Sequence, residues 1–417
     1  MAETLCLFED EGVVNLYPLT LTRPAFELRC GMSSLREKIV RELKPRKVVL
    51  HCRSYLGEAV REENEGALVN SLPEEDVLFV NGRLLIDGAV AKKIAAHRPA
   101  AFWQGEELVA AWVPASKIPE LRSKLADFFH PQWLSDLPRI EVEARLIVWP
   151  WDLIHYNADE IRREFSALGL GGQLRGKIYP NVSLIGKENI FVGEKAELWP
   201  GVVIMAEEGP VYIADGATIM ANAVIVGPSY IGPKSMIKIG AKIYEGTSVG
   251  EVCKVGGEVE ESIIHAYSNK QHEGFLGHAY LGTWVNLGAD TNNSDLKNNY
   301  APVRVQINDR LVDTGSLFVG LFMGDHTKTG INTMFNTGTV VGVACNVYGE
   351  GFPPRFIPSF HWGGARGLAK YSLEKTLETA RRVMARRNKE LTPAQEAVLR
   401  RVYEMPAPPI LDKGATM

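Results

Sequence analysis

An aliphatic residue recurs at every sixth position through the central part of the chain, and a small residue follows it four places later. The period holds without a slip from Ile213 to Val255; Ile219, for example, is followed by Ala223. Such a repeat is typical of a parallel β-helix, in which each hexapeptide forms one short strand and three of them complete a triangular coil of about 18 residues. The repeat therefore predicts a left-handed parallel β-helix over residues 174–350.

The repeat is interrupted twice. It fails over residues 260–279, resumes at Leu281, fails again over residues 292–301 and recovers loosely from Val319. Interruptions in a stack of coils are commonly loops that leave the prism, and functional residues concentrate in such loops. We therefore expect both interruptions to be loops that carry the chemistry of the protein.

The residues before the repeat alternate between strand-like apolar runs and helix-like stretches. This alternation predicts an α/β domain with a largely parallel sheet. The expected strands are residues 4–8, 47–51, 77–80 and 107–112, and the expected helices are residues 33–43, 88–97, 118–129 and 151–168.

Three glycines, Gly169, Gly171 and Gly172, mark the boundary between this domain and the repeat. After the repeat, a segment rich in proline, glycine and aromatic residues is expected to pack against the outside of the prism. Two helices should follow, with Thr392 as the N-cap of the second. The expected parts are an α/β domain over residues 1–168, the β-helix over residues 174–350, and a C-terminal loop and helical tail over residues 351–417.

The composition excludes several classes of protein. A chain of 417 residues with 46% hydrophobic and 23% charged residues is typical of a globular protein with more than one domain. A net charge of −4 offers no electrostatic footprint for nucleic acid or an anionic membrane. Its five cysteines are scattered, which argues against a disulfide framework or a zinc site. We expect a cytoplasmic protein without a signal peptide or membrane span.

The densest polar cluster lies in the first interruption and the coil after it. Residues 268–278 read Ser-Asn-Lys-Gln-His-Glu-Gly-Phe-Leu-Gly-His, residues 285–291 read Val-Asn-Leu-Gly-Ala-Asp-Thr, and residues 299–300 read Asn-Tyr. This pattern resembles the acetyltransferase half of the bifunctional GlmU-type enzymes, which acetylate glucosamine-1-phosphate and then uridylylate the product. The sequence departs from the family pattern at Phe275, where the family has tyrosine, and at His278, where it has aspartate.

The resemblance assigns His272 as the general base. The chemistry is reasonable on its own terms, because an amino sugar is mostly ammonium at neutral pH and must lose a proton before it attacks a thioester. A histidine that titrates near neutrality is suited to accept that proton. The resemblance further implies that Lys270 binds the sugar phosphate, that Asn286 and Tyr300 hold sugar hydroxyls or the base, and that Phe275, Asn299 and Lys254 complete the substrate site.

The same resemblance implies acetyl-CoA as the acyl donor and a homotrimer with sites between subunits. Acetyl-CoA would lie along the groove between neighbouring prisms, where Gly320 and Gly324 would permit close approach of the backbone. His326 is a second candidate in this region, for which a structural and a functional role are equally open.

The N-terminal domain departs further from the family. In GlmU-type nucleotidyltransferases the first strand runs into a glycine-rich loop whose N–H groups cradle the nucleotide phosphates. Here three acids, residues 9–11, precede the single Gly12, which should repel a triphosphate. Arg83, two residues after Asn81, stands where the family has a Mg²⁺-binding aspartate. Mg²⁺ is thus expected only if the domain still transfers nucleotides, and its ligands are unknown.

Two further blocks, residues 8–31 and 324–342, resemble a divergent GlmU-like subfamily of sugar nucleotidyltransferases, so that the likeness spans nearly the whole chain. Arg23 and Arg29, together with Asn81, are candidates to bind a sugar nucleotide or phosphate through charge-assisted hydrogen bonds. Structural ion pairs are an equally good reading of the two arginines.

Three functions follow from these patterns. The leading one is acetyl-CoA-dependent N-acetylation of a sugar phosphate by His272, beside a reduced nucleotidyltransferase domain. The second is nucleotidyl transfer from UTP or another nucleoside triphosphate to a sugar-1-phosphate, with the β-helix as a trimerisation scaffold. The third is a non-catalytic scaffold that binds sugar nucleotides.

Overall fold

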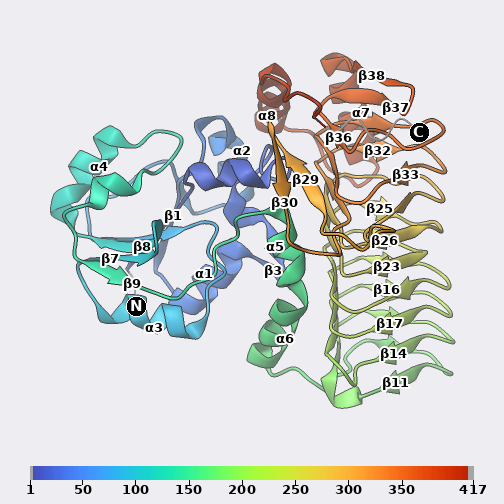
Figure 1. The fold of residues 1–417 in the computed structure, drawn as a ribbon. Helices are drawn as coiled ribbons and strands as arrows, with labels where there is room; N and C mark the ends of the chain where they lie inside the picture. Colours follow the sequence, from blue (N-terminus) through green and yellow to red (C-terminus); the bar gives the residue numbers. More distant parts are fainter. Residues whose placement is uncertain (1–2, 412–417) are drawn as a thin grey trace.

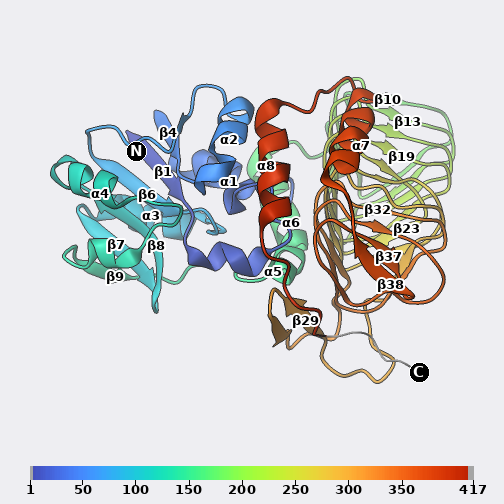
Figure 2. The same cartoon turned by 90° about the horizontal axis from the view of Figure 1, so that it is seen from above.

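The computed structural model describes residues 3–411. An α/β domain lies beside a triangular prism of stacked coils, and a pair of C-terminal helices lies against both (Figures 1 and 2). The predicted fold class, an α/β domain followed by a left-handed parallel β-helix and a helical tail, is confirmed. Within residues 3–411, the longest helices are too short or too polar to cross a membrane.

The α/β domain contains one seven-stranded sheet in which β5, β4, β1 and β6 are parallel and β8 is antiparallel to its neighbours. Its four expected strands are confirmed, and the expected helix from residue 118 is shorter than predicted. The strands are β1 (Thr4–Phe8), β4 (Lys47–Leu50), β5 (Leu68–Val69), β6 (Val77–Asn81), β7 (Ala100–Gln104), β8 (Glu107–Val113) and β9 (Arg139–Glu141). The helices are α1 (Leu35–Leu43), α2 (Gly57–Glu63), α3 (Gly88–Ala96) and α4 (Ile118–Lys124).

The prism has three faces, each a ladder of short strands. Face 1 contains β10 (Lys177–Ile178), β13 (Glu197–Leu198), β16 (Thr218–Ile219), β19 (Met236–Ile237), β22 (Lys254–Val255), β25 (Asn269–Lys270), β32 (Lys328–Thr329), β35 (Asn346–Val347), β37 (His361–Gly364) and the antiparallel β38 (Gly367–Lys370). Face 2 contains β11 (Ser183–Ile185), β14 (Val203–Met205), β17 (Val224–Val226), β20 (Lys242–Ile243), β23 (Glu258–Glu260), β26 (Phe275–Gly277), β28 (Asn292–Asn293) and β33 (Met334–Phe335).

Face 3 contains β12 (Ile190–Val192), β15 (Val211–Ile213), β18 (Ser229–Ile231), β21 (Thr247–Val249), β24 (Ile263–Ala266), β27 (Tyr280–Thr283), β31 (Leu321–Met323), β34 (Thr339–Val341) and β36 (Phe356–Ile357). The aliphatic residue of each hexapeptide points inward, as the repeat predicts. On face 3, Ile213, Ile231, Val249 and Ile264 stand in register and are fully buried.

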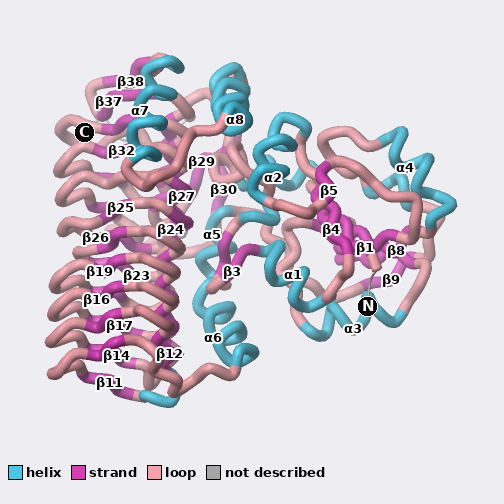
Figure 3. Tube along the Cα trace, turned by 180° about the vertical axis from the view of Figure 1, so that it is seen from behind, coloured by secondary structure: helices cyan, strands magenta, loops and turns pink. Residues whose placement is uncertain are grey.

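The outward side of face 3 is apolar and faces the α/β domain. Its column of register-matched residues includes Tyr212, Tyr230, Tyr280 and Phe322. The upper part of this column belongs to one hydrophobic cluster with Trp151 and other residues of the linking helix α5 (Pro150–His155). Lower down, Tyr230 packs in a second cluster with Ile161 of the linking helix α6 (Asn157–Leu168). These helices lie between the sheet domain and the prism (Figure 3). Face 3 is therefore an interface within the chain, which leaves faces 1 and 2 to the outside.

The two interruptions have different structures, and only one of them leaves the prism. Residues 260–279 stay in the prism as strands joined by tight turns, so the loop predicted there is wrong. The second interruption leads into a hairpin, β29 (Arg304–Ile307) and β30 (Arg310–Asp313), that leaves the prism. Its Asn308 Nδ2 donates to the Val14 carbonyl at 2.9 Å, which docks the hairpin on the α/β domain.

The C-terminal part begins as one more coil of the prism. β36 pairs with β34 and β37 with β35, so residues 352–367 extend the ladders instead of packing outside them as predicted. The two predicted helices are confirmed as α7 (Leu373–Ala385) and α8 (Pro393–Glu404). Thr392 caps α8 through a reciprocal pair of hydrogen bonds with Gln395. Helix α8 packs against α2, between the α/β domain and the prism (Figure 2).

A buried cluster of charges fixes α6 to α1. The fully buried Lys38 Nζ lies 2.9 Å from Glu160 and 2.5 Å from Glu164. Burial alone would raise the pKa of Glu164, but the ammonium of Lys38 and its other donors outweigh burial and lower that pKa to about 2. Helix α6 in turn touches β18 and β21, so this cluster supports the interface between the two parts of the chain.

Removal of the Lys38 charge should destabilise the whole fold. Lys38→Met removes the buried ammonium that both carboxylates share and leaves them only the partly exposed Arg41 and Arg163. We expect a loss of about 3–5 kcal/mol in the free energy of unfolding at pH 7. Because the pKa of Glu164 is depressed to about 2, its contribution is present above its usual value of 4.5 and fades as the pH falls toward 2. Urea unfolding from pH 7 to pH 2 measures both effects. Lys92→Met, at an exposed site, is the control; equal stability of the two variants at pH 7 contradicts the account.

Candidate functional site

The loop after β1, where a nucleotidyltransferase would hold phosphate, is filled by an arginine. Arg83 is 1% exposed and reaches both oxygens of Asp10, with Nε at 2.8 Å and Nη2 at 2.6 Å. A Cβ built on Gly12 would lie 2.5 Å from the Arg83 guanidinium carbon. The residues present therefore fit neither a triphosphate nor the Mg²⁺ that nucleotidyl transfer implies, since Asp10 is neutralised and a guanidinium cannot bind a metal.

Asn81, a predicted ligand-binding residue, belongs to the same closed arrangement. Its side chain is fully buried and donates to Asp10 at 2.7 Å and to the Leu108 carbonyl at 3.0 Å. It holds the loop shut and is not open to a ligand in this structure. Asn157 is also structural: it accepts from the Gly31 N–H at 2.6 Å and donates to the Gly246 carbonyl at 2.7 Å, which ties the α/β domain to the prism.

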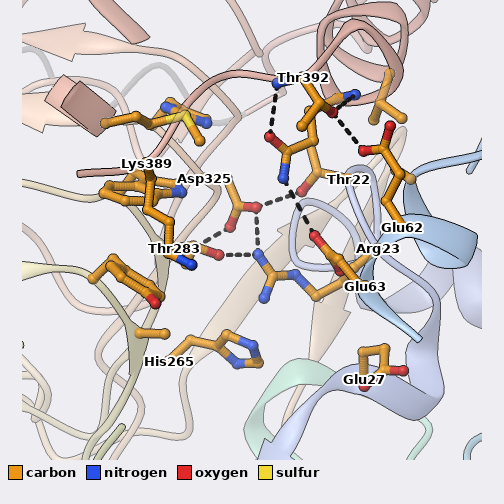
Figure 4. Close-up of a pocket in the computed structure, with 18 of the residues that line it drawn as sticks. Thr22, Arg23, Glu27, Glu62, Glu63, His265, Thr283, Asp325, Lys389 and Thr392 are labelled. Atoms are coloured by element: carbon orange, nitrogen blue, oxygen red, sulfur yellow. Dashed lines mark hydrogen bonds and ion pairs between the residues drawn. The ribbon is translucent and has the colours of Figure 1, made fainter. Parts of the chain in front are cut away.

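A cavity of about 640 Å³ lies between the α/β domain, the prism and helix α8. It brings together three predicted site residues, Arg23, Arg29 and His326, from opposite ends of the sequence. We call it the interdomain pocket; Figure 4 shows its labelled lining residues, among them Thr22, Glu63, His265, Asp325 and Lys389.

The two predicted arginines of the interdomain pocket, Arg23 and Arg29, have carboxylate partners on the prism. Arg23 donates to Asp325 and to Thr283, and Asp325 also accepts from Thr22 at 2.7 Å (Figure 4). Arg29 lies 3.3 Å from Glu251, while its Nε is buried and has no hydrogen-bond partner among the described residues. In this structure the two arginines therefore form structural ion pairs, one of the two roles expected from the sequence. Both pairs span the interface between the α/β domain and the prism.

An aromatic ladder lines the pocket along the edge between faces 3 and 1. The rings of Tyr267 and Trp284 stack at 4.5 Å, and those of Trp284 and His326 at 6.3 Å. All three residues have positive φ, from 52° to 61°, a backbone conformation that bulky side chains rarely adopt. Burial, followed by the charge of Lys328, lowers the pKa of His326 to about 3, so its imidazole is neutral at pH 7.

His272, the predicted base, lies elsewhere. It is exposed in the turn between β25 and β26, on the edge between faces 1 and 2. Lys270, predicted to bind the sugar phosphate, instead points inward in the column of Val255. Its Nζ donates to the carbonyls of Gly256 and His272 at 2.9 Å each, and burial lowers its pKa to about 8. The side chain therefore supports the turn that carries His272 and does not face a ligand here.

The remaining predicted substrate residues are spread over the prism. Phe275 is half-buried on face 2, and Lys254 and Asn286 lie on the outward side of face 1, where Asn269 donates to Asn286 at 3.3 Å. Asn299 and Tyr300 lie in the loop before the hairpin, with Tyr300 69% exposed. Among the described residues, no side-chain hydrogen bond or ion pair joins any of these residues to His272.

The two glycines predicted to lie against acetyl-CoA instead lie against the backbone of neighbouring coils in the prism. A Cβ on Gly320 would collide with the Gly277 carbonyl of the neighbouring coil, and one on Gly324 would lie 2.8 Å from Val343 N. Glycine is required at both positions for the coils to stack, so neither provides evidence for a bound cofactor.

A second histidine on the prism, noted in the sequence only as a departure from the family pattern, has the geometry of a base. His278, at the end of β26 opposite to His272, places Nδ1 2.8 Å from Asp295 Oδ2, and its ring stacks on Phe318. A carboxylate on Nδ1 fixes the tautomer and leaves Nε2 as the basic atom. The two residues are 17 apart, the length of one coil here, which is the signal that could have found the pair.

The pair between Arg23 and Asp325 should contribute strongly to the stability of the interface. Asp325→Asn leaves the guanidinium without its buried carboxylate, and we expect a loss of about 3–5 kcal/mol in unfolding free energy at pH 7. Chemical denaturation measures the loss, with the exposed Asp309→Asn as the matched control. A loss below about 1 kcal/mol, the scale of surface pairs, would show that the pair is not a structural link.

Comparisons with known proteins find relatives for parts of the chain. Residues 5–172 match a family described as sugar nucleotidyl transferase. The chain is 30% identical over 199 residues, 48% of its length, to a bifunctional sugar-1-phosphate nucleotidylyltransferase/acetyltransferase of Sulfurisphaera tokodaii, of which it covers 43%. It is 34% identical over 196 residues, 47% of its length, to the bifunctional protein GlmU of Methanocaldococcus jannaschii, of which it covers 41%.

The chain thus spans less than half the length of these curated relatives. A solved UDP-N-acetylglucosamine acyltransferase is similar over 46% of this chain and 70% of its own, at 14% identity and a TM-score of 0.26, which is too low to carry an argument. Residues 5–172 therefore match the sugar nucleotidyl transferase family, and the chain is similar over about half of its length to bifunctional proteins of the GlmU type.

Proposed function

We propose that this protein is an acetyl-CoA-dependent N-acetyltransferase of a sugar phosphate and that its N-terminal domain no longer transfers nucleotides. The observation that carries the proposal is the contrast between the two halves. Arg83 fills the loop that would hold a triphosphate, whereas the turn of the prism that bears His272 is open to solvent. The name of one relative, which pairs nucleotidyl transfer with acetyl transfer, supports the acetyltransferase part of the proposal.

In the proposed reaction, the imidazole of His272 accepts a proton from the amino group of the sugar as the nitrogen attacks the thioester carbonyl. The C–S bond then breaks, and the CoA thiolate leaves and is protonated, which gives the amide and free CoA. The base must be exposed to the substrate, and the imidazole of His272 is exposed. His278, held by Asp295, is the second imidazole of the same segment and must be tested beside it.

The proposed assembly is a homotrimer in which acetyl-CoA lies between prisms. Face 3 is covered by the α/β domain, so subunit contacts must use faces 1 and 2. Aliphatic side chains are exposed on face 2 and on the edge that carries His272: Ile185 (38%), Met205 (38%), Met334 (39%), Ile239 (60%) and Ile331 (70%). Their burial between subunits would place His272 in a cleft, where Lys254 on face 1 is available to an anionic donor.

The decisive variant is His272→Ala. We expect acetyl-CoA and glucosamine-1-phosphate to release CoA with wild-type protein, and kcat to fall about 10²–10⁴-fold in the variant because the general base is lost. A thiol-detecting assay measures the rate, and thermal unfolding confirms that the fold is intact. His278→Ala is the matched control and should retain most activity. Loss of activity in His278→Ala alone would move the base to His278, and a wild-type protein without CoA release contradicts the function itself.

The alternative, nucleotidyl transfer, makes the opposite prediction. Because Arg83 and Asp10 occupy the phosphate loop, we expect no Mg²⁺-dependent release of pyrophosphate from UTP and a sugar-1-phosphate. A coupled pyrophosphate assay over several nucleoside triphosphates tests this expectation. Turnover in wild-type protein that depends on Asp10, as shown by Asp10→Asn, would overturn it.

A further inference from the structure

We propose that the interdomain pocket is a second ligand site, which binds an amino sugar in its ammonium form and excludes sugar phosphates and nucleotides. The proposal is independent of acetyl transfer, because none of the pocket residues lies in the turn that carries His272. It concerns a site that neither half of the chain could form alone.

The pocket is built from three separate parts of the chain. Its walls are the segment Thr22–Glu37 with helix α2, the edge of the prism between faces 3 and 1, and the start of helix α8. Its volume of about 640 Å³ lies in the range of small-molecule sites, ample for a monosaccharide and its water. A ligand there would touch all three parts and strengthen the interface.

The charge of the pocket opposes an anion. Four cations line it, Arg23, Arg29, Arg36 and Lys389, against seven carboxylates, Glu27, Glu37, Glu62, Glu63, Glu251, Glu390 and Asp325, so that its formal charge is −3. The three arginines are each paired with a carboxylate, which leaves only Lys389 among the described cations of the pocket without an ion pair. Such a cavity repels phosphate and attracts a cationic group.

Glu63 is the best candidate to receive the ammonium. It lies on the wall of the pocket (Figure 4), and its contacts there are a 3.4 Å hydrogen bond from Gln395 and the more distant charge of Arg23. Burial raises its pKa, and Arg23 opposes this rise only in part. A carboxylate that opens onto the cavity with so little compensation gains from a cation that a ligand brings with it.

The other free groups of the pocket suit hydroxyls. His326 Nδ1 and Arg29 Nε are buried without a hydrogen-bond partner among the described residues, and His265 uses only Nδ1, which binds Tyr280. The indole N–H of Trp284 also has no partner within residues 3–411. These donors and acceptors converge on one cavity, as the binding of a ring with several hydroxyls requires.

Isothermal titration calorimetry with glucosamine, glucose, glucose-1-phosphate and UTP tests the proposal. We expect glucosamine to bind most tightly and to raise the melting temperature. Glu63→Gln keeps the shape of the wall but removes its charge, and should weaken glucosamine about tenfold, the loss of one charge-assisted hydrogen bond, with little effect on glucose. Glu106→Gln, at a side chain that is 95% exposed, is the matched control and should bind as wild type does.

Two variants separate this inference from the proposed function. His272→Ala should retain glucosamine binding, and Trp284→Phe should weaken both sugars because it removes the indole N–H. Tighter binding of glucose-1-phosphate or UTP than of glucosamine would overturn the inference. So would the absence of any sugar binding, or a Glu63→Gln variant that binds glucosamine as wild type does. Loss of glucosamine binding in His272→Ala, with Glu63→Gln unaffected, would place the amino sugar at the prism edge and contradict the pocket alone.

Discussion

The burial of the outward side of face 3 is the constraint on which the rest of this structure depends. An isolated coiled prism would expose the column of Tyr212, Tyr230, Tyr280 and Phe322 to water. In this chain the linking helices and the α/β domain cover the column, and the ion pairs of Lys38 and Arg23 together with the hydrogen bonds of Asn157 fix their position. As a consequence, the faces open to partners and substrates are 1 and 2, and the pocket opens where the cover meets the edge of face 3.

Much of this fold could be predicted because local repetition determines it. The six-residue period specified which side chains point into the prism, and the first strand is confirmed to the residue, Thr4–Phe8. The period says less where coils change length. In its column, Lys270 comes 15 residues after Val255 instead of 18. Because this coil is shorter, the six-residue period does not predict that the Lys270 side chain points inward. The docking face is also visible in the sequence, since aromatic residues occupy the outward position of consecutive face 3 strands.

The candidate site was harder to predict because its contacts join distant segments. Arg23 and Arg29 were identified as charged clamps, but their partners, Asp325 and Glu251, follow from how the domain docks on the prism. Asp295 becomes relevant only when stacking sets it beside His278. Arg83 shows the reverse case, because the loss of the glycine-rich loop was visible in the sequence and the structure adds that an ion pair fills the space. Under the proposed function, the chemistry lies at an edge of the prism and not at the first strand.

The central claim is that chemistry occurs on the prism, at His272, and not in the α/β domain. A crystal structure of the protein with CoA and glucosamine-1-phosphate tests it most directly. We predict CoA along a groove formed by faces 1 and 2, with the amine of the sugar within hydrogen-bond reach of the His272 imidazole, about 3 Å. A sugar phosphate bound in the loop after β1, with no ligand near His272, would contradict the claim.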